Sequence, residues 1–296
     1  MTNKNVESAT DSLDWLTGEG FFGKTSKDLL EHRSSVSPTN FYYEVIASIY
    51  ADIGDKSSLN QFALAFMSLF TEGLSVEAQE TIDLLTALMV GDKNNPGIET
   101  ISSYAQYVES MQSYKNEVFS AQSKMKLGQS IPVATKISLA KQLVRVFDEG
   151  FEYDMKIMAF MLAIKQMVLK KKYDILKNLA QPSARKIKLF KDLDPFHQYA
   201  LLTDGWDTIV RNADSHVNLR YDARNNVYLG KNQYKQRVEQ GGQLVIENFT
   251  ITPELILTNL LPRVTNFLQG YLVAAYMLLL SKSDQTLYAQ AAKFLE

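Results

Sequence analysis

The chain has 296 residues, of which 46% are hydrophobic, enough to bury one large core or two modest ones. It contains no cysteine, which excludes disulfides, thiolate nucleophiles and cysteine metal sites, and its three histidines argue against a histidine-built zinc site. The formal net charge of −2 excludes a nucleic-acid role based on overall basicity, so such a role must rest on a local patch.

The N-terminal segment Met1–Asp11 is polar and lacks the apolar stretch of a signal peptide, which predicts a cytoplasmic protein. The most apolar run, Phe267–Leu280, is interrupted by Gln269 and is shorter than the ~20 residues that cross a bilayer. We therefore expect a buried core helix there, and no membrane partner.

Residues Gly18–Thr25 follow the phosphate-binding spacing G-x-x-x-x-G-K-[ST], with Lys24 and Thr25 at its end. A nucleotide site of this kind needs a buried strand before the loop and a helix after it. The preceding segment Ser12–Thr17 is half polar, and no series of apolar strands alternates with helices later in the chain. We predict a glycine turn leading into a helix at Lys27–His32, and keep a nucleotide-binding protein as the least favoured alternative.

Apolar residues recur at helical spacing through most of the first half of the chain. This spacing predicts four helices, the second capped by Ser57 and Ser58 and the third facing Ile82, Leu85 and Met89 inward. Their ranges are Asn40–Ile53, Ser58–Phe70, Val76–Val90 and Glu99–Lys126. The turn-rich stretch Leu127–Pro132 predicts a boundary between a helical region of unknown role, residues 1–130, and a second domain, residues 131–296.

The second domain begins with a long helical pattern, Thr135–Ala180, in which Gly150 is a candidate break and whose end becomes strongly basic. A basic run of this kind is either a solvated helix face or a surface that follows the phosphates of RNA without choosing a sequence. The residues that we predict for RNA binding are Lys170, Lys171, Lys172, Arg185, Lys186 and Lys188.

After Pro182 and Ser183, the Asp194-Pro195 pair predicts the start of a helix that runs through Tyr199 and Trp206 and ends at Arg211. The pattern then changes to that of strands: a hairpin around the turn Asp222–Asn226, and a further strand at Gln243–Ile246. Thr252-Pro253-Glu254 opens the last long helix, Leu255–Leu280, and Asp284–Glu296 supplies a final amphipathic turn or two.

The segment Arg211-Asn212-Ala213-Asp214-Ser215-His216 resembles the R-N-x-x-x-H motif of HEPN ribonucleases. The order of predicted elements around it, over Thr135–Glu296, is similar to the HEPN fold. The resemblance implies an antiparallel helical bundle with a small β-hairpin after the motif. It does not cover residues 1–130, whose apolar spacing predicts a helical N-terminal extension, so the whole chain is expected to be all-α.

The resemblance also implies a metal-independent endoribonuclease without a cofactor, active as a homodimer with a composite active site. RNA carries its own nucleophile, the 2′-hydroxyl. His216, with an unperturbed pKa of roughly 6.5, would act as acid or base, Arg211 would bind phosphate oxygens in the transition state, and Asn212 would orient either group.

Residues five apart on a continuous helix point ~140° away from each other. Arg211 and His216 would then meet at one phosphate only if Asp214 and Ser215 bend the chain, or if the two side chains serve a cleft between two subunits. The alternative is a helix-end arginine and a turn histidine that are bonded to Asp214 or Asp222.

Ribonucleases of this kind commonly act in toxin-antitoxin, abortive-infection or antiviral systems, so we expect an RNA substrate and an antitoxin or defence-system partner. Some are silenced by modification of a tyrosine two places after the histidine. Here that place is Asn218, and the nearest tyrosine is Tyr221. A non-catalytic helical module that binds RNA or protein is the main alternative function.

Overall fold

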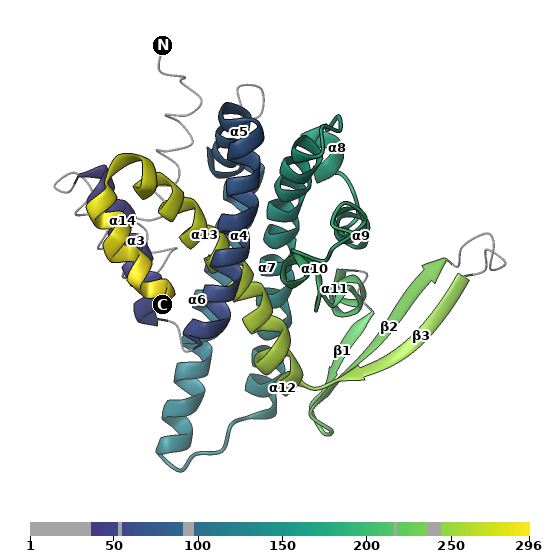
Figure 1. The fold of residues 1–296 in the computed structure, drawn as a ribbon. Coiled ribbons are helices and arrows are strands. Elements are labelled where there is room, and N and C mark those ends of the chain that lie inside the picture. The colour runs from purple at the N-terminus through teal and green to yellow at the C-terminus, as the bar shows by residue number, and fades with distance from the viewer. Residues whose placement is uncertain (1–36, 53–54, 91–97, 216–217, 236–243) are drawn as a thin grey trace. The chain divides into compact units, whose positions relative to one another are not determined.

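Residues 37–52, 55–90, 98–215, 218–235 and 244–296 are described in a computed structural model of the protein. The predicted phosphate loop, the helix predicted at Lys27–His32 and the catalytic candidate His216 lie outside the described residues. The described chain is mostly helical with one small antiparallel sheet, which confirms the predicted fold class at this level (Figure 1).

Most helices agree closely with the predicted ranges; the exceptions are the helices predicted at Thr135–Ala180 and from Asp194 to Arg211. Before the sheet they are α3 Pro38–Asp52, α4 Lys56–Val76, α5 Ala78–Val90, α6 Ile98–Lys126, α7 Val133–Val168, α8 Ile175–Leu179, α9 Ser183–Asp192, α10 Ala200–Thr203 and α11 Thr208–Ser215. After it come α12 Pro253–Leu255, a π-helical turn Ile256–Leu260, α13 Leu261–Ser283, α14 Gln285–Ala292 and a 3-10 turn Lys293–Leu295.

The sheet consists of β1 Leu219–Asp222, β2 Val227–Lys235 and β3 Leu244–Ile251, paired antiparallel in that order. The Asp222 carboxylate accepts a hydrogen bond from the backbone N–H of Arg224 at 3.0 Å, which fixes the turn between β1 and β2. The predicted hairpin and third strand are therefore confirmed.

The chain forms two compact units, each assembled from separate stretches of sequence. Unit 1 comprises Met1–Glu109, Glu152–Gly205 and Thr265–Glu296, and unit 2 comprises Ser110–Phe151 and Trp206–Val264. The boundary predicted between residues 130 and 131 falls inside unit 2. Helices α6, α7 and α13 each contribute residues to both units.

Aromatic side chains of α4 and α13 form the centre of unit 1. The ring of Phe66 lies 4.9 Å from that of Phe267 and 5.7 Å from that of Tyr271, edge to face in both cases. Gly270 lies between these two α13 residues, and a Cβ atom there would be 2.5 Å from the Cβ of Phe62. The missing side chain is what allows the two helices to approach so closely.

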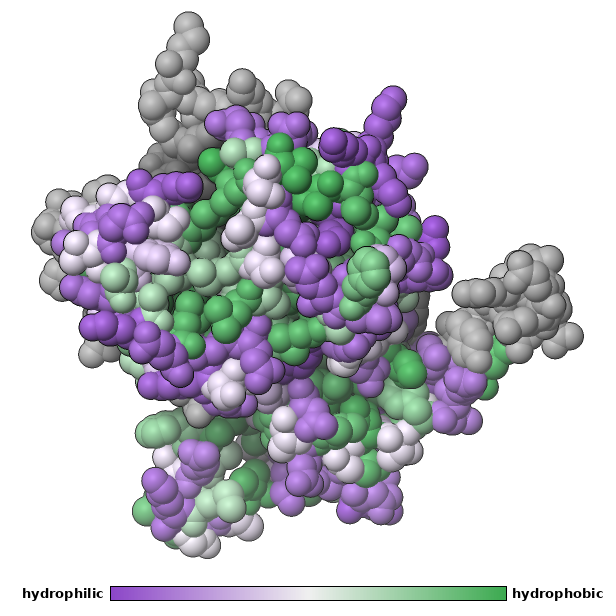
Figure 2. Space-filling view, viewed as in Figure 1, coloured by the Kyte–Doolittle hydropathy of each residue, from purple (hydrophilic) through white to green (hydrophobic). Residues whose placement is uncertain are grey.

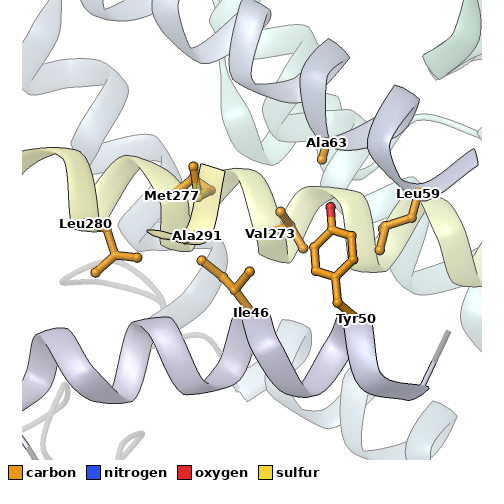
Figure 3. Packing of buried hydrophobic residues seen from close by; sticks show 8 residues of the cluster. All are labelled: Ile46, Tyr50, Leu59, Ala63, Val273, Met277, Leu280 and Ala291. Atoms are coloured by element: carbon orange, nitrogen blue, oxygen red, sulfur yellow. The ribbon is translucent and has the colours of Figure 1, made fainter. Parts of the chain in front are cut away.

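A second cluster in unit 1 holds the C-terminus against the first described helix. Figure 3 shows Ile46 and Tyr50 of α3 facing Val273 and Met277 of α13, with Ala291 of α14 beside them. The Tyr50 hydroxyl donates to Asn60 Oδ1 at 2.6 Å, and the ring of Tyr50 stacks on Phe294 at 5.0 Å. These contacts explain why α14 lies beside α3 in Figure 1.

In unit 2 the sheet packs on α7. Tyr228 of β2 is buried, and its hydroxyl donates to the carbonyl of Ala140 at 2.7 Å. Gly230 of β2 lies opposite Phe249 of β3, and the Phe249 ring occupies the space that a side chain at residue 230 would need. Phe147 and Phe151 of α7 pack with ring centroids 5.9 Å apart.

The single helix predicted from Asp194 to Arg211 is wrong. The backbone of Gly205 takes φ +77°, a conformation that breaks the helix between α10 and α11. Phe196, which follows Pro195 and would be the first apolar residue of the predicted helix, is 92% exposed. The Asp194 carboxylate does accept N–H groups, those of Gln198 and Tyr199, but it caps a turn rather than a helix.

Three smaller predictions at helix positions are also corrected. Ile82 is exposed, whereas Leu85 is buried as predicted, together with Leu84. The cap of α4 is Asp55, whose carboxylate accepts from the N–H of Ser58 at 3.1 Å. Helix α7 ends at Val168 rather than at residue 180. Just after this end, the backbone of Lys170 takes φ +54°.

One described helical stretch, Pro253–Ser283, is long and apolar enough to cross a membrane, judged by length and composition alone. Of its most apolar window, 61% is buried inside the protein. Phe267, Val273 and Leu280 are fully buried, as expected for the core helix predicted at this position.

Candidate active site

Helix α11 carries the arginine of the motif and is fixed by its own cap. The Asp207 carboxylate accepts hydrogen bonds from the backbone N–H groups of Ile209 at 2.8 Å and Val210 at 3.3 Å. The helix buries Val210 and Ala213. This burial sets the rotation of α11 about its axis.

The rotation of α11 leaves Arg211 half-buried and Asn212 exposed. Consecutive helical residues point ~100° apart, so the two side chains leave the helix in different directions. Arg211 therefore has its stem against the protein and is the better placed of the two to hold a fixed orientation.

An aromatic contact in unit 2 precedes the cap of α11. The ring of Trp206 packs edge to face on Phe151 at 5.3 Å, and the Arg263 guanidinium carbon lies 4.5 Å from the centroid of the same ring. These contacts anchor the chain at the residue next to Asp207. Neither contact could be predicted from the sequence, because Trp206 lies between α10 and α11 and both of its partners, Phe151 and Arg263, are far from it along the chain.

His216 and Val217 lie outside the described residues, but Ser215 before them and Asn218 after them are described. The N–H of Asn218 donates to the carbonyl of Ala213 at 2.7 Å, and the N–H of Lys231 donates to the carbonyl of Asn218 at 3.1 Å. Asn218 thus ties α11 to the sheet through its backbone. The relation of Arg211 to His216 remains a prediction.

The predicted RNA-binding residues all lie in unit 1, and five of the six are exposed. Lys170, Lys171 and Lys172 form an exposed turn after α7, where the N–H of Lys171 donates to the carbonyl of Gln166 at 2.8 Å. On α9, Arg185 and Lys188 are exposed. Lys188 forms an ion pair with Asp192 at 2.8 Å, one helical turn away.

Two other lysines of the basic run point inward. Lys186 is 3% exposed, so it does not share a surface with its neighbours. Lys165 is also buried, and its Nζ lies 3.0 Å from Glu72 Oε2 and 4.7 Å from the centroid of the Tyr199 ring. Burial raises the pKa of Tyr199 and the Glu72 charge raises it further, so this hydroxyl stays protonated.

The part of the chain that the structure describes brings no three histidine, aspartate or glutamate side chains together in a way that could hold a metal ion. His197, which is exposed, lies on a turn where its backbone takes φ +56°. Comparison with models of known protein families, with curated proteins and with solved structures finds no match for this chain.

Proposed function

We propose that the chain is a metal-independent endoribonuclease of the HEPN type, which cleaves single-stranded RNA. One observation carries the proposal: the R-N-x-x-x-H spacing from Arg211 to His216 begins on a short helix, between a long buried helix and a small sheet. A Thr-Pro-Glu start and a second long helix, α13, follow the sheet. The resemblance implies this order, except that three short helices, α8, α9 and α10, stand between α7 and α11.

The proposed reaction uses the substrate's own nucleophile. The 2′-oxygen of one nucleotide attacks the adjacent phosphorus, and the bond from phosphorus to the 5′-oxygen breaks. One His216 takes the proton of the 2′-hydroxyl, and a second His216 gives a proton to the departing 5′-oxygen. The products are a 2′,3′-cyclic phosphate and a 5′-hydroxyl.

Arg211 would hold the phosphate during this reaction. Its planar guanidinium can bind two oxygens of the phosphorane, whose negative charge is greater than that of the starting diester. The cap at Asp207 and the burial of Val210 support this role, because they fix the helix from which Arg211 extends. Asn212, which is exposed, would orient the arginine or the substrate.

We further propose that two copies of the chain form one composite site, since a single helix would direct Arg211 and His216 away from each other. Lys170, Lys171, Lys172 and Arg185 would bind phosphates of the bound strand. The protein would act in the cytoplasm as a toxin or an antiviral effector, restrained by an antitoxin or another defence-system partner.

The decisive experiment incubates the purified protein with single-stranded RNA in the presence of EDTA. Cleavage should persist and should fall by roughly 100-fold or more in Arg211→Ala and in His216→Ala. Arg220→Ala is the matched control, because Arg220 is an exposed arginine on β1 of the same unit and should leave the rate unchanged. Analysis of the RNA ends should find the cyclic phosphate.

Adding the inactive His216→Ala protein to the unmodified protein tests the composite site. Because the proposed reaction uses one His216 from each subunit, mixed dimers should be inactive, and the total activity should fall as the variant is added. RNA that is bound but not cut by the unmodified protein would contradict the nuclease and favour a non-catalytic RNA-binding module. Magnesium-dependent nucleotide hydrolysis that is lost in Lys24→Ala would favour a nucleotide-binding protein.

A further inference from the structure

The hairpin between α6 and α7, in unit 2, has a defined tip. Gly128 takes φ +72°, the N–H of Gly128 donates to the carbonyl of Met125 at 2.9 Å, and the N–H of Gln129 donates to that of Lys124 at 3.0 Å. These two bonds form a Schellman motif, the common glycine-dependent end of a helix. The backbone of the tip therefore has a defined conformation at the end of α6.

The side chains at this tip are apolar and exposed. Met125 is 61% exposed, Leu127 75% and Val133 61%. All three lie within the stretch that joins the last turn of α6 to the first residue of α7. In the region of Figure 2 where Figure 1 places the end of α6, hydrophobic residues appear next to hydrophilic ones. Three large exposed apolar side chains at one tip indicate a surface that binds a partner outside this chain.

The charge around the tip has one sign. Between Glu117 and Asp148 the sequence contains no acidic residue, whereas it contains Lys124, Lys126, Lys136, Lys141 and Arg145. Arg145 is compensated, because it pairs with Glu149 at 2.8 Å. Glu117 accepts a hydrogen bond from Ser138 at 3.0 Å. The lysines nearest the tip are Lys124, which is half-buried, and Lys126 and Lys136, which are exposed.

We propose that this tip, Met125–Lys136, docks on the surface of an anionic lipid bilayer. Met125, Leu127 and Val133 would enter the boundary between headgroups and acyl chains, and the lysines would contact anionic headgroups. An apolar surface bordered by lysines is the pattern that binds peripheral proteins to such membranes. The inference departs from the expectation that the protein has no membrane partner, and it does not depend on the proposed nuclease activity.

The dimensions of the hairpin fit this interaction. Peripheral segments bury their apolar side chains roughly 5–10 Å into the interface. Lys136 lies three residues along α7 from Val133, or about 4.5 Å at the rise of a helix, so its ammonium group reaches the headgroup layer when Val133 enters the bilayer. Phe119, 72% exposed, lies about 12 Å along α6 from Leu127 and would stay near the headgroups, where aromatic rings are favoured.

Nucleic acid fits the same surface less well. RNA is bound by cations together with aromatic rings on which bases stack, and the aliphatic side chains of Leu127 and Val133 offer no such face. Exposing these side chains to a polyanion would leave them in water. A bilayer accommodates both the cations and the aliphatic groups, and this is why the membrane is the better match.

The test is co-flotation of the full chain with vesicles of phosphatidylcholine alone or of phosphatidylcholine with phosphatidylglycerol. The chain should float with the anionic vesicles and not with the neutral ones. The double variant Met125→Ser, Leu127→Ser should reduce the bound fraction about tenfold or more, through loss of apolar burial. Lys126→Gln with Lys136→Gln should weaken binding by roughly fivefold for each charge removed.

Matched controls come from the same unit. Leu257→Ser replaces another exposed apolar residue, 42% exposed, and Lys231→Gln replaces an exposed lysine on β2. Both should bind anionic vesicles as the unmodified chain does. Circular dichroism should find all variants folded, because the altered side chains are exposed. Failure of the unmodified chain to float with anionic vesicles, equal binding to neutral vesicles, or tip variants that bind normally would each overturn the proposal. Loss of RNA affinity in the tip variants without loss of flotation would do the same.

Discussion

Two buried glycines, Gly270 and Gly230, differ in what an added Cβ atom would contact. A Cβ atom at Gly270 would lie 2.5 Å from Phe62 Cβ and 3.0 Å from the backbone nitrogen of Ala63, so α4 and α13 would have to separate. A Cβ atom at Gly230 would meet only the far end of the Phe249 side chain, which can rotate away.

We therefore expect Gly270→Ala to lower the free energy of unfolding by about 1–3 kcal/mol, and Gly230→Ala to lower it by less. Urea unfolding followed by circular dichroism would measure both differences. The two variants serve as controls for each other, because each adds one methyl group at a buried glycine. Equal effects, or a larger effect at Gly230, would contradict the packing described for α4 and α13.

Buried tyrosines predict how stability depends on alkaline pH. Burial raises the pKa of Tyr107 to about 12 from its usual 10.0, against a small lowering by its hydrogen bond with Thr265. Above pH 10 the unfolded chain loses this proton while the folded chain keeps it. The protonated Tyr107 therefore contributes its full stabilisation below pH 10, and this contribution is lost as the pH rises towards 12. The free energy of unfolding should fall by about 2–3 kcal/mol over this range.

The measurement is the free energy of unfolding at several pH values between 9 and 12, for the unmodified chain and for Tyr107→Phe. Lysines titrate in the same range, so the difference between the two proteins is the informative quantity. That difference should shift in favour of the phenylalanine variant as the pH rises. A difference that stays constant across the range would show that Tyr107 is not held protonated by burial.

Some side-chain orientations have no signal in the sequence. Lys186 and Arg185 are neighbours in one basic run, yet one is buried and the other exposed. Charge in the sequence indicated a basic surface but not which side of α9 would face the protein. The inward turn of Lys165 depends on Glu72, a residue 93 positions away, and such a pairing leaves no local signal.

At the scale of elements, spacing and caps predicted most helices and all three strands. The ends of the helices depend on features other than the spacing of apolar residues. The break at Gly205 is an example: the apolar residues Tyr199, Trp206 and Val210 keep approximately helical spacing across it, so periodicity alone predicts one continuous helix. This error affects the candidate site, because Arg211 lies on a separate short helix, α11, and not at the end of a long one.

The cap of α11 carries the next prediction. Asp207→Ala removes the acceptor for two backbone N–H groups and should destabilise α11 by about 1 kcal/mol. Hydrogen exchange at the amides of Ile209 and Val210 should become faster, and RNA cleavage should decrease if Arg211 is catalytic. Asp207→Ser keeps a capping oxygen and should preserve both properties. Unchanged exchange in Asp207→Ala would show that packing, not the cap, holds α11.

At the scale of the whole molecule, the interleaving of the two units has a consequence for how the chain folds. Unit 1 draws α4 from the first half of the chain and α13 from the second, and its aromatic centre exists only when both are present. Composition and turn residues predicted a boundary at Leu127–Pro132, where the chain does turn. Contacts between distant segments, which no local pattern records, decide that this turn lies within unit 2.

The two halves on either side of that turn should therefore not fold independently. A fragment of residues 131–296 would expose Phe267 and Tyr271, which α4 covers through Phe66 and Phe70 in the intact chain. We expect this fragment alone to bind a hydrophobic dye and to unfold without a cooperative transition. Co-expression with residues 1–130 should restore a cooperative transition, because the separated segments can then form the same core. A fragment 131–296 that unfolds cooperatively by itself would mean that the second half is an autonomous domain, and that the contacts between α4 and α13 are dispensable.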